Sequence, residues 1–398
     1  MTVTLAEIRA ARAVIEGVCV RTPMISAATF SQWCGFRVRL KAENLQRTGS
    51  FKLRGATNRV AALTPAERKR GVVAASAGNH AQGLALAARS AGVSARIYMP
   101  LDASLAKQQA TLGYAAEVVL AGETFDDAQS AARADPDGRV FVSAFDDPRI
   151  VAGTGTLGVE LLEDAPDCDT IVVPLGGGGL LAGVAIAAKS LNPAIRVVGV
   201  QAAGCASYLA SIAAGKPVAA PFATTIADGI AVKRPGDFTF PLVQRYVDEI
   251  VEVDEAEISR AIIALLERSK LLVEGGGAAA LAALLAGRVR GNDVVCVLSG
   301  GNIDLRLLQS VVRFGLDSSG RFLKLRTTMP DRPGSLNRVL TALADARVNV
   351  LDVEHHREAL ELGVSDVSCF ITVETRGPSH ADDVLAMIRQ AGFPAERV

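Results

Sequence analysis

The sequence contains few aromatic residues and no net charge, and both absences exclude classes of function. Phe, Trp and Tyr make up 5% of the 398 residues. The 42 Lys and Arg are balanced by 42 Asp and Glu, so the formal net charge at pH 7 is zero. A neutral chain offers no electrostatic reason to bind nucleic acid or an anionic membrane surface. We therefore expect neither among its partners.

The chain also lacks paired cysteines, long apolar runs and a signal-peptide pattern. Its six cysteines form no C-x-x-C pair and none lies at zinc-ligand spacing from a histidine, so we predict no metal site. A disulfide scaffold is not expected at this size, which favours free thiols in a reducing compartment. No segment approaches the roughly 20 apolar residues of a membrane span, and no apolar run follows a basic stretch near the first residue. We expect a cytoplasmic location.

What the chain does have is material for a large core, since 49% of its residues are hydrophobic. Its length predicts two or three domains. Short apolar runs alternate with helical patterns, and each run ends in a Gly, Ser or Pro loop, as in residues 72–75, 95–99, 170–173, 197–200 and 294–298. This order predicts an α/β fold with buried parallel strands and crossover helices. Ligands bind at the carboxyl ends of such strands, where the glycine loops fall here.

The pattern changes at a predicted linker, residues 317–320. An alternating strand (322–327), a turn (331–334) and a helix (335–346) follow it, and then come two strands (349–355 and 367–373) and a last helix (380–391). The order predicts a β-α-β-β-α-β, ferredoxin-like domain over about 75 residues.

Two motifs contain polar side chains at predicted helix starts. Lys52 opens a helix after Ser50 and Phe51. Because a helix dipole favours anions at this end, a lysine there indicates phosphate binding or a Schiff base, the alternative being a solvated surface lysine. Residues 76–83 follow a strand and start a helix, so backbone N–H groups with Ser76 and Asn79 could bind a carboxylate. The alternative is an ordinary capped turn.

Two further motifs follow later strands. Gly176 to Gly179 are four consecutive glycines between a strand and a helix, an arrangement that favours wrapping of a phosphate by backbone N–H groups over a flexible loop. Ser299 lies just after the strand 294–298, where its hydroxyl could bond a ring nitrogen or simply end the strand.

Two glycine patterns resemble dinucleotide-binding loops without their context. Residues 153–158 match G-x-G-x-x-G, but Asp146-Asp147-Pro148 precedes them rather than a full strand. Residues 177–182 match a looser form, and Gln201 stands where a ribose-binding acid is expected, which argues against NAD. The sequence contains no G-x-S-x-G and no P-loop motif.

The four motifs, in this order and spacing, resemble the serine/threonine dehydratase family of fold-type-II pyridoxal-phosphate enzymes over roughly residues 5 to 315. Residues 321–398 resemble an ACT domain through their segments 331–335 and 349–355, and residues 274–278 are similar to the E-G-x-G-A pattern of short, single-ACT members. The resemblance implies a catalytic domain (1–316) of two open-sheet subdomains of the tryptophan synthase β-like kind. The smaller, about 50–145, is inserted in the larger, and an ACT regulatory domain (321–398) follows.

Carried over residue by residue, the resemblance also implies roles for the motifs. Lys52 would hold pyridoxal 5'-phosphate as a Schiff base and move the substrate's α-proton. Phe51 would pack on the ring, Asn79 would bond the ring hydroxyl and Ser299 the pyridine nitrogen. The cofactor phosphate would bind Gly176, Gly177, Gly178 and Gly179, and the substrate carboxylate would bind Ser76, Gly78, Asn79 and His80. Because serine is not an acid that protonates the pyridine nitrogen, such a ring is a weaker electron sink, which suits elimination.

The activity implied is β-elimination and deamination of L-threonine to 2-oxobutanoate and ammonia, and of L-serine to pyruvate. The alternatives are a serine-preferring dehydratase, a non-catalytic amino-acid sensor, and a cysteine or tryptophan synthase relative. Racemases of the family carry a second serine where this chain has Ala77, and an acidic divalent-cation pair at positions similar to Gln201 and Ser207. We therefore expect little racemisation and no tight magnesium site, with room left for a monovalent ion. The ACT domain implies an amino-acid effector, with isoleucine inhibiting and valine opposing it, and the family implies a homo-dimer or homo-tetramer.

Overall fold

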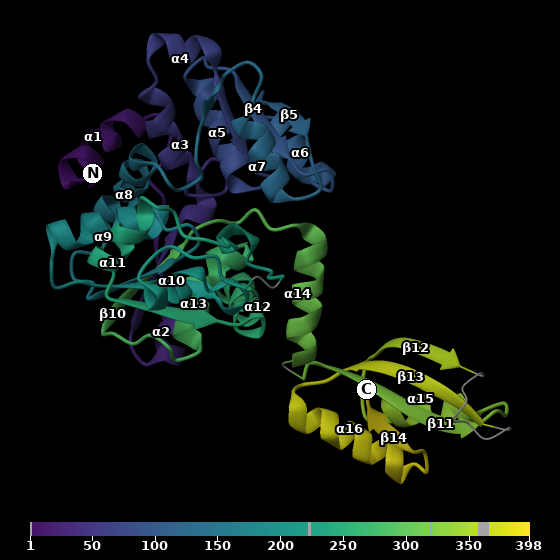
Figure 1. Cartoon of the computed structure of the whole chain (residues 1–398). Helices are drawn as coiled ribbons and strands as arrows, with labels where there is room; N and C mark the ends of the chain where they lie inside the picture. Colours follow the sequence, from purple (N-terminus) through teal and green to yellow (C-terminus); the bar gives the residue numbers. More distant parts are fainter. Residues whose placement is uncertain (1, 222–223, 319, 357–365) are drawn as a thin grey trace. The chain divides into compact units, whose positions relative to one another are not determined.

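The computed structural model describes residues 2–221, 224–318, 320–356 and 366–398. The chain divides into two compact units, Met1–Asp304 and Leu305–Val398 (Figure 1). Helix α14 (Leu305–Ser318) therefore belongs to the second unit, whereas the sequence placed the end of the catalytic domain near residue 316. Ser319 of the expected linker lies outside the described residues. In the described part of the chain, no helix combines the length and apolar character needed to cross a membrane.

The larger sheet of the first unit has six strands, all parallel except β1 at one edge. Its order is β1 (Met24–Ser26), β2 (Arg37–Ala42), β10 (Asp293–Leu298), β7 (Thr170–Pro174), β8 (Arg196–Ala202) and β9 (Glu249–Val253). The register pairs Leu298 with Ala42 and Cys296 with Val172. The carboxyl ends of β2, β10 and β7 therefore meet at one edge. The three strands expected near residues 170, 197 and 294 are confirmed, each longer by one to three residues.

The smaller sheet contains four parallel strands in the order β5 (Glu117–Leu120), β4 (Ala95–Met99), β3 (Val72–Ala75) and β6 (Val140–Phe141). The predicted bounds of β3 and β4 agree with the structure. Helices α4 (Pro65–Arg70), α5 (Asn79–Ser90), α6 (Leu105–Leu112) and α7 (Phe125–Arg133) alternate with these strands (Figure 1). β3 is buried along its whole length, as expected for a strand at the centre of such a sheet.

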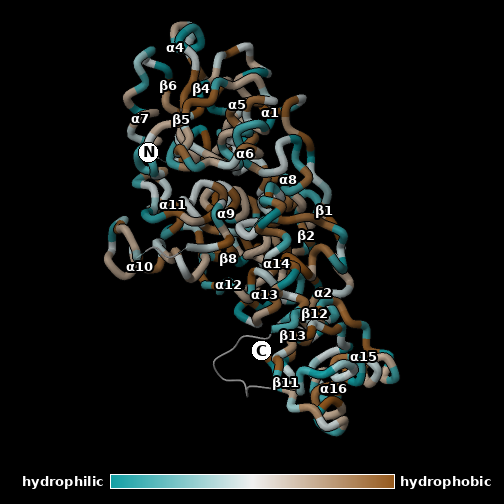
Figure 2. Tube along the Cα trace, turned by 90° about the vertical axis from the view of Figure 1, so that its right-hand side faces the viewer, coloured by the Kyte–Doolittle hydropathy of each residue, from teal (hydrophilic) through white to brown (hydrophobic). Residues whose placement is uncertain are grey.

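The core of the larger sheet is formed by its strands and by apolar helices packed against them. The helices of this part are α1 (Leu5–Ile15), α2 (Ala28–Cys34), α3 (Lys52–Ala61), α8 (Pro148–Asp164), α9 (Gly179–Leu191), α10 (Ser207–Ala214), α11 (Thr239–Tyr246), α12 (Glu255–Ala264) and α13 (Gly275–Leu285). Single turns, η1 (Glu43–Leu45), η2 (Ala203–Cys205) and η3 (Asp228–Ile230), and the π-helical η4 (Leu265–Ser269) connect them. The hydrophobic colouring in Figure 2 is dense around α9, β8 and α13. α9 and α13 are buried on nearly all sides, which explains their lack of polar residues.

The G-x-G-x-x-G pattern at residues 153–158 lies inside α8, which begins at the cap Asp147 with Pro148 in its first turn. Its glycines allow close helix packing. A Cβ on Gly153 would lie 2.6 Å from the carbonyl oxygen of Arg54 on α3, and one on Gly158 would lie 2.9 Å from that of Val184 on α9. The expectation that this pattern binds no dinucleotide therefore has a structural reason, because the glycines face other helices.

The second unit contains an antiparallel sheet in the order β12–β13–β11–β14, together with helices α14, α15 and α16. The elements are β11 (Phe322–Pro330), α15 (Ser335–Asp345), β12 (Val350–His356), β13 (Asp366–Glu374), α16 (Pro378–Gln390) and β14 (Ala395–Arg397). Burial alternates along β11, as it must when one face of the sheet packs against a core. The β-α-β-β-α-β order is confirmed. The short β14 was not located from the sequence.

Candidate active site

Lys52 is positioned by a pairing between two segments far apart in the chain. Ser50 forms an isolated antiparallel bridge with Gly300, and the backbone N–H of Phe51 donates to the carbonyl of Ser299 at 3.1 Å. Helix α3 begins at Lys52, so the lysine lies at the helix N-terminus, as predicted. The pairing brings Lys52 beside the end of β10, and thereby beside Ser299.

The Lys52 side chain is partly buried, and its amine contacts protein groups. Its Nζ donates to the carbonyl of Ala144 at 3.2 Å and lies 5.0 Å from the centre of the Phe51 ring. Burial lowers the pKa of Lys52 to about 8, although the Glu274 carboxyl acts in the opposite direction. The amine is therefore not freely solvated, and a larger fraction of it is unprotonated, and so nucleophilic, near neutral pH than in an ordinary lysine.

The four glycines line a pocket together with Phe51, Lys52 and Ser299. Added side chains would fill this loop: a Cβ on Gly177 would lie 2.2 Å from the Phe145 ring, and one on Gly178, whose φ is +92°, 1.9 Å from the Tyr208 hydroxyl. Helix α9 starts at Gly179, and the first N–H groups of a helix have no partner within it. The loop and helix end together form a cradle that fits a phosphate group.

Three side chains that the sequence did not single out support the glycine loop. Thr239 donates its hydroxyl to the carbonyl of Gly177 at 2.7 Å, and the Tyr208 hydroxyl donates to the same carbonyl at 3.3 Å. Asp146 accepts hydrogen bonds from the backbone N–H groups of Phe238 and Thr239. The two hydroxyls occupy the Gly177 carbonyl, and Asp146 holds the segment that carries Thr239, which favours presentation of the loop's N–H groups to an anion.

The predicted carboxylate loop forms the turn from β3 into α5. The Ser76 hydroxyl accepts from the backbone N–H of Gly78 at 3.1 Å, and α5 begins at Asn79. The His80 ring hydrogen-bonds through Nε2 to the carbonyl of Val142 at 3.0 Å, and burial lowers its pKa to about 4, with Lys52 acting in the same direction. A neutral ring engaged with the backbone leaves the N–H groups of the helix end as the part of this loop that can bind a carboxylate.

Asn79 lies between two polar side chains, Glu274 and Asn302, to which the sequence motifs assign no role. Its Nδ2 donates to Oε1 of Glu274 at 2.6 Å, and its Oδ1 accepts from Nδ2 of Asn302 at 2.7 Å. Glu274 is 5% exposed. The sequence signal for Glu274 is its place in residues 274–278, the segment similar to the E-G-x-G-A pattern. Ser299 is also buried, and its hydroxyl has one long contact, 3.5 Å to the carbonyl of Gly276.

The side chains of Gln201 and Ser207, at the positions similar to the racemase divalent-cation pair, form hydrogen bonds within the protein. Oε1 of Gln201 accepts from the backbone N–H groups of Tyr208 and Leu209, and the Ser207 hydroxyl donates to the carbonyl of Val232. Gln201 therefore serves as a cap for the start of α10. Over the described ranges, no group of three or more His, Cys, Asp or Glu side chains could hold a metal ion.

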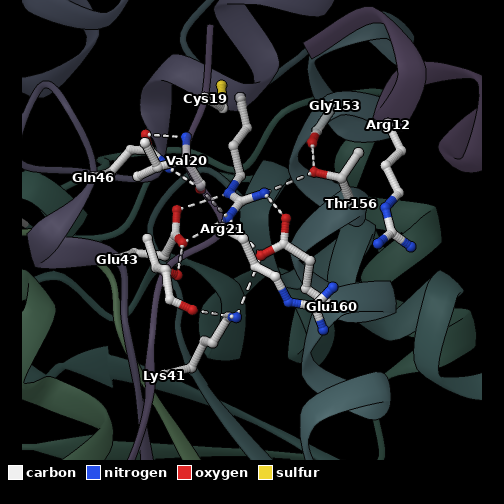
Figure 3. Close-up of polar contacts among 12 residues, drawn as sticks. Arg12, Cys19, Val20, Arg21, Lys41, Glu43, Gln46, Gly153, Thr156 and Glu160 are labelled. Atoms are coloured by element: carbon white, nitrogen blue, oxygen red, sulfur yellow. Dashed lines mark hydrogen bonds and ion pairs between the residues drawn. The ribbon is translucent and has the colours of Figure 1, made fainter. Parts of the chain in front are cut away.

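A buried ionic network around Glu43 and Glu160 attaches α3 to its neighbours (Figure 3). Arg54 is fully buried, and it donates to both oxygens of Glu43 at 2.8 Å and to Glu160 at 2.7 and 2.9 Å. Lys41 lies 3.3 Å from Glu160 and 2.9 Å from Asp164. The network joins α3 to η1 and α8, and so fixes the helix whose first residue is Lys52.

Comparison with known proteins agrees with this geometry. The family model described as pyridoxal-phosphate dependent enzyme matches residues 15–300, and the ACT domain model matches residues 324–386. The chain belongs to the pyridoxal-phosphate-dependent enzyme family and carries an ACT domain. Within that family it is similar to an L-threonine ammonia-lyase of Thermotoga maritima, with 45% identity over 98% of both chains.

Solved structures of the same fold support the assignment. Maize serine racemase matches with a TM-score of 0.75 and 34% identity, covering 80% of this chain and 99% of that one. The processed form of threonine deaminase isoform 2 from Solanum lycopersicum matches with a TM-score of 0.74 and 36% identity, covering 78% and 86%. Pyridoxal phosphate is therefore the cofactor of the family to which this chain belongs, and the cradle, the Lys52 amine and Ser299 fit it.

Proposed function

We propose that this protein converts L-threonine to 2-oxobutanoate and ammonia, and L-serine to pyruvate. The single observation that carries the proposal is the shared pocket: the Lys52 amine, the glycine cradle and Ser299 line one cavity at the carboxyl ends of β7 and β10. The near full-length similarity to an L-threonine ammonia-lyase supports threonine as the main substrate.

Each residue of the pocket has a role in the proposal. Gly176 to Gly179 bind the cofactor phosphate, Ser299 bonds the pyridine nitrogen, Phe51 packs on the ring, and Lys52 holds the cofactor. When bound, pyridoxal phosphate supplies a conjugated ring that stabilises the electron pair left at the substrate's α-carbon. Because the serine hydroxyl is a weak acid, it does not protonate that nitrogen fully. This favours rapid loss of a β-hydroxyl over transamination.

The substrate's carboxylate and α-proton are handled by separate groups. The residues Ser76, Gly78, Asn79 and His80 bind the carboxylate, chiefly through the N–H groups at the start of α5. Lys52, whose bond to the cofactor would first be exchanged for one to the substrate's amine, would then be free to take the α-proton. A general base is most effective when its pKa lies near the working pH. The lowered pKa of about 8 brings this lysine into that range. Water lost in the elimination is regained on hydrolysis, so the net product besides the 2-oxo acid is ammonia.

The proposal includes regulation, assembly and location. In the proposal the catalytic part is residues 1–316, which adds most of α14 to the first compact unit, with a smaller subdomain at about 50–145, and residues 321–398 form the regulatory part. An amino-acid effector binds the ACT domain, with isoleucine as inhibitor and valine opposing it, and the enzyme works as a homo-dimer or homo-tetramer. A cytoplasmic location is supported by the six cysteines, all of which are free thiols.

The test is formation of 2-oxo acid by the purified protein, with L-threonine and L-serine compared at equal concentrations. We expect turnover of both, with the larger kcat/KM on threonine, and we expect Lys52→Ala to lose at least about 10³-fold in kcat. Isoleucine and valine are added in parallel assays. The absence of 2-oxo acid with either substrate, in protein that holds pyridoxal phosphate, would rule the activity out. Formation of D-serine from L-serine as fast as pyruvate would contradict the expectation from Ala77.

A further inference from the structure

Glu274 has the position of a helix cap and does not act as one. It precedes α13 at the N-cap position, yet its side chain makes no capping hydrogen bond. Within the part of the chain that the structure describes, no Lys, Arg or His lies at ion-pair distance from it. Its Oε1 instead accepts the 2.6 Å hydrogen bond from Nδ2 of Asn79, at the start of α5. A buried carboxyl that neither caps a helix nor pairs with a cation needs another explanation.

The hydrogen bonds around Asn79 are compatible with one orientation of its side-chain amide. Nδ2 of Asn302 donates to the backbone carbonyl of Thr48 at 2.8 Å, and a carbonyl can only accept. The same nitrogen lies 2.7 Å from Asn79, so the Asn79 atom facing it must be the oxygen. The nitrogen of Asn79 is therefore the atom that faces Glu274. Rotating the amide by 180° would place two donors together at Asn302 and two acceptors together at Glu274.

Two glycines make room for this carboxyl at the edge of the pocket. A Cβ on Gly300 would lie 2.4 Å from Oε1 of Glu274 and 3.1 Å from Nδ2 of Asn79. A Cβ on Gly229, which lines the pocket, would lie 3.2 Å from the same oxygen. The Glu274–Asn79 contact therefore lies between two backbone segments of the site. A side chain on either segment would disturb it.

The charged groups around Glu274 come from three elements. Lys52 on α3 and Lys107 on α6 favour the ionised carboxyl, whereas Asp228 on η3 disfavours it; Lys107 and Asp228 are themselves paired at 3.1 Å. Burial, with Asp228, raises the pKa of Glu274 to about 7. The neighbouring His80 stays neutral at that pH. The charge on Glu274 therefore changes within the range in which an enzyme of this kind works.

We propose that Glu274 is a positioning residue of this site: its carboxylate holds the Asn79 amide so that the second N–H of Nδ2 is directed at the hydroxyl of the cofactor ring. This inference rests on the proposed function, which assigns Asn79 to that hydroxyl. An ionised acceptor makes a stronger hydrogen bond than a neutral one and polarises the amide that donates to it. The cofactor is therefore held more tightly when Glu274 is ionised than when it is protonated.

The experiment titrates apoprotein with pyridoxal phosphate from pH 5.5 to 9 and measures Kd by quenching of protein fluorescence. In the wild type we expect affinity to rise with pH, first near pH 7 as Glu274 ionises and then near pH 8 as Lys52 loses its proton. The two steps overlap, so the step near pH 7 is obtained from the difference between the wild-type and Glu274→Gln profiles. In Glu274→Gln we expect Kd at pH 8 to rise about tenfold or more, because the charge-assisted bond is lost, and we expect the step near pH 7 to disappear. Glu274→Asp keeps the charge and should restore that step in part.

Glu257→Gln serves as the matched control, since Glu257 is a largely buried carboxyl on α12 that pairs with Arg288 outside the pocket. It should bind pyridoxal phosphate as the wild type does. Asn302→Ala provides a second route should Glu274→Gln not fold: it frees the Asn79 amide to rotate but leaves the carboxyl, so it should weaken binding and keep the step near pH 7.

Binding by Glu274→Gln within twofold of the wild type, with an unchanged pH profile, would overturn the positioning role. A failure of the proposed function would give a different result, because the wild-type protein itself would then bind no pyridoxal phosphate or release no 2-oxo acid. The two failures are therefore distinguishable.

Discussion

Replacing Arg54 by methionine tests whether the buried network stabilises the helix that begins at Lys52. The change removes a fully buried guanidinium but keeps most of its apolar volume. Glu43, which is also fully buried, would lose both of the hydrogen bonds that it accepts from Arg54. The hydrogen bond that it accepts from the Thr22 hydroxyl would remain. Glu160 would keep the nearby Lys41. Removing one partner of a buried ion pair costs about 3–5 kcal/mol, and we expect Glu43 to account for most of this loss.

The assay is thermal unfolding of the full-length apoprotein at pH 8. A loss of about 3–5 kcal/mol corresponds to a fall in Tm of roughly 6–10 °C for a large domain. The control is Arg234→Met, which breaks an exposed pair with Asp237 and should change stability by less than about 0.5 kcal/mol. Adding Glu43→Gln to Arg54→Met should recover at least half of the loss, because no unpaired carboxylate remains at that position.

The pH dependence of stability provides a second test, because the direction of the change can be stated in advance. In the wild type, burial opposes ionisation of Glu43, but Arg54 and the hydrogen bonds hold its pKa below the ordinary value, so its stabilisation is present above that value and is lost as the pH falls. Without Arg54, burial dominates and raises the pKa of Glu43. The deficit of Arg54→Met should therefore shrink on going from pH 8 to pH 5. A variant within about 1 kcal/mol of the wild type, or one whose deficit grows on acidification, would refute the reasoning.

Two other predictions concern the pocket. Gly177→Ala should raise the Kd for pyridoxal phosphate at least about tenfold, because its Cβ would overlap the Phe145 ring. The control is Gly113→Ala, where a Cβ meets only ordinary contacts and the Kd should not change. If the two variants bound pyridoxal phosphate with equal affinity, the glycine cradle would be contradicted. The rate at which apoprotein captures pyridoxal phosphate should rise with pH and reach half its maximum near pH 8, because only the unprotonated Lys52 amine reacts. Stopped-flow absorbance measures this rate, and a midpoint near the ordinary lysine value of 10.5 would show that burial does not lower the pKa.

Local patterns predicted much of the fold. Five parallel strands of the first unit, β3, β4, β7, β8 and β10, are apolar runs followed by a glycine, serine or proline loop, since both faces of such a strand are covered. β2 has no such run, because Arg37, Arg39 and Lys41 alternate with its apolar residues. The Val72–Ala75 and Ala95–Met99 strands were therefore placed to the residue. The alternation along residues 322–327 identified β11 for a similar reason, because only one of its faces is buried. The last strand of the predicted β-α-β-β-α-β order received no bounds, since a segment as short as the three-residue β14 carries no period.

The site was predictable where a residue type is unusual for its local position. Lys52 at a helix N-terminus and four consecutive glycines both conflict with ordinary local preferences, and such conflicts indicate function. Glu274 gave no comparable signal, because an acid before a helix is a common cap. Thr239 and Tyr208 gave none either, because their partner is a backbone carbonyl of a distant loop.

The sequence by itself determined the elements and the chemical groups available to the site, because strand burial, helix starts and glycine loops depend on residues near one another in the chain. Only the tertiary structure decided which groups act together. The Ser50–Gly300 bridge brings Lys52 to Ser299, and the fold brings Asn79 to Glu274. It also decided the chemical state of these groups, since the pKa values of Lys52 and Glu274 depend on burial and on charges contributed by other elements.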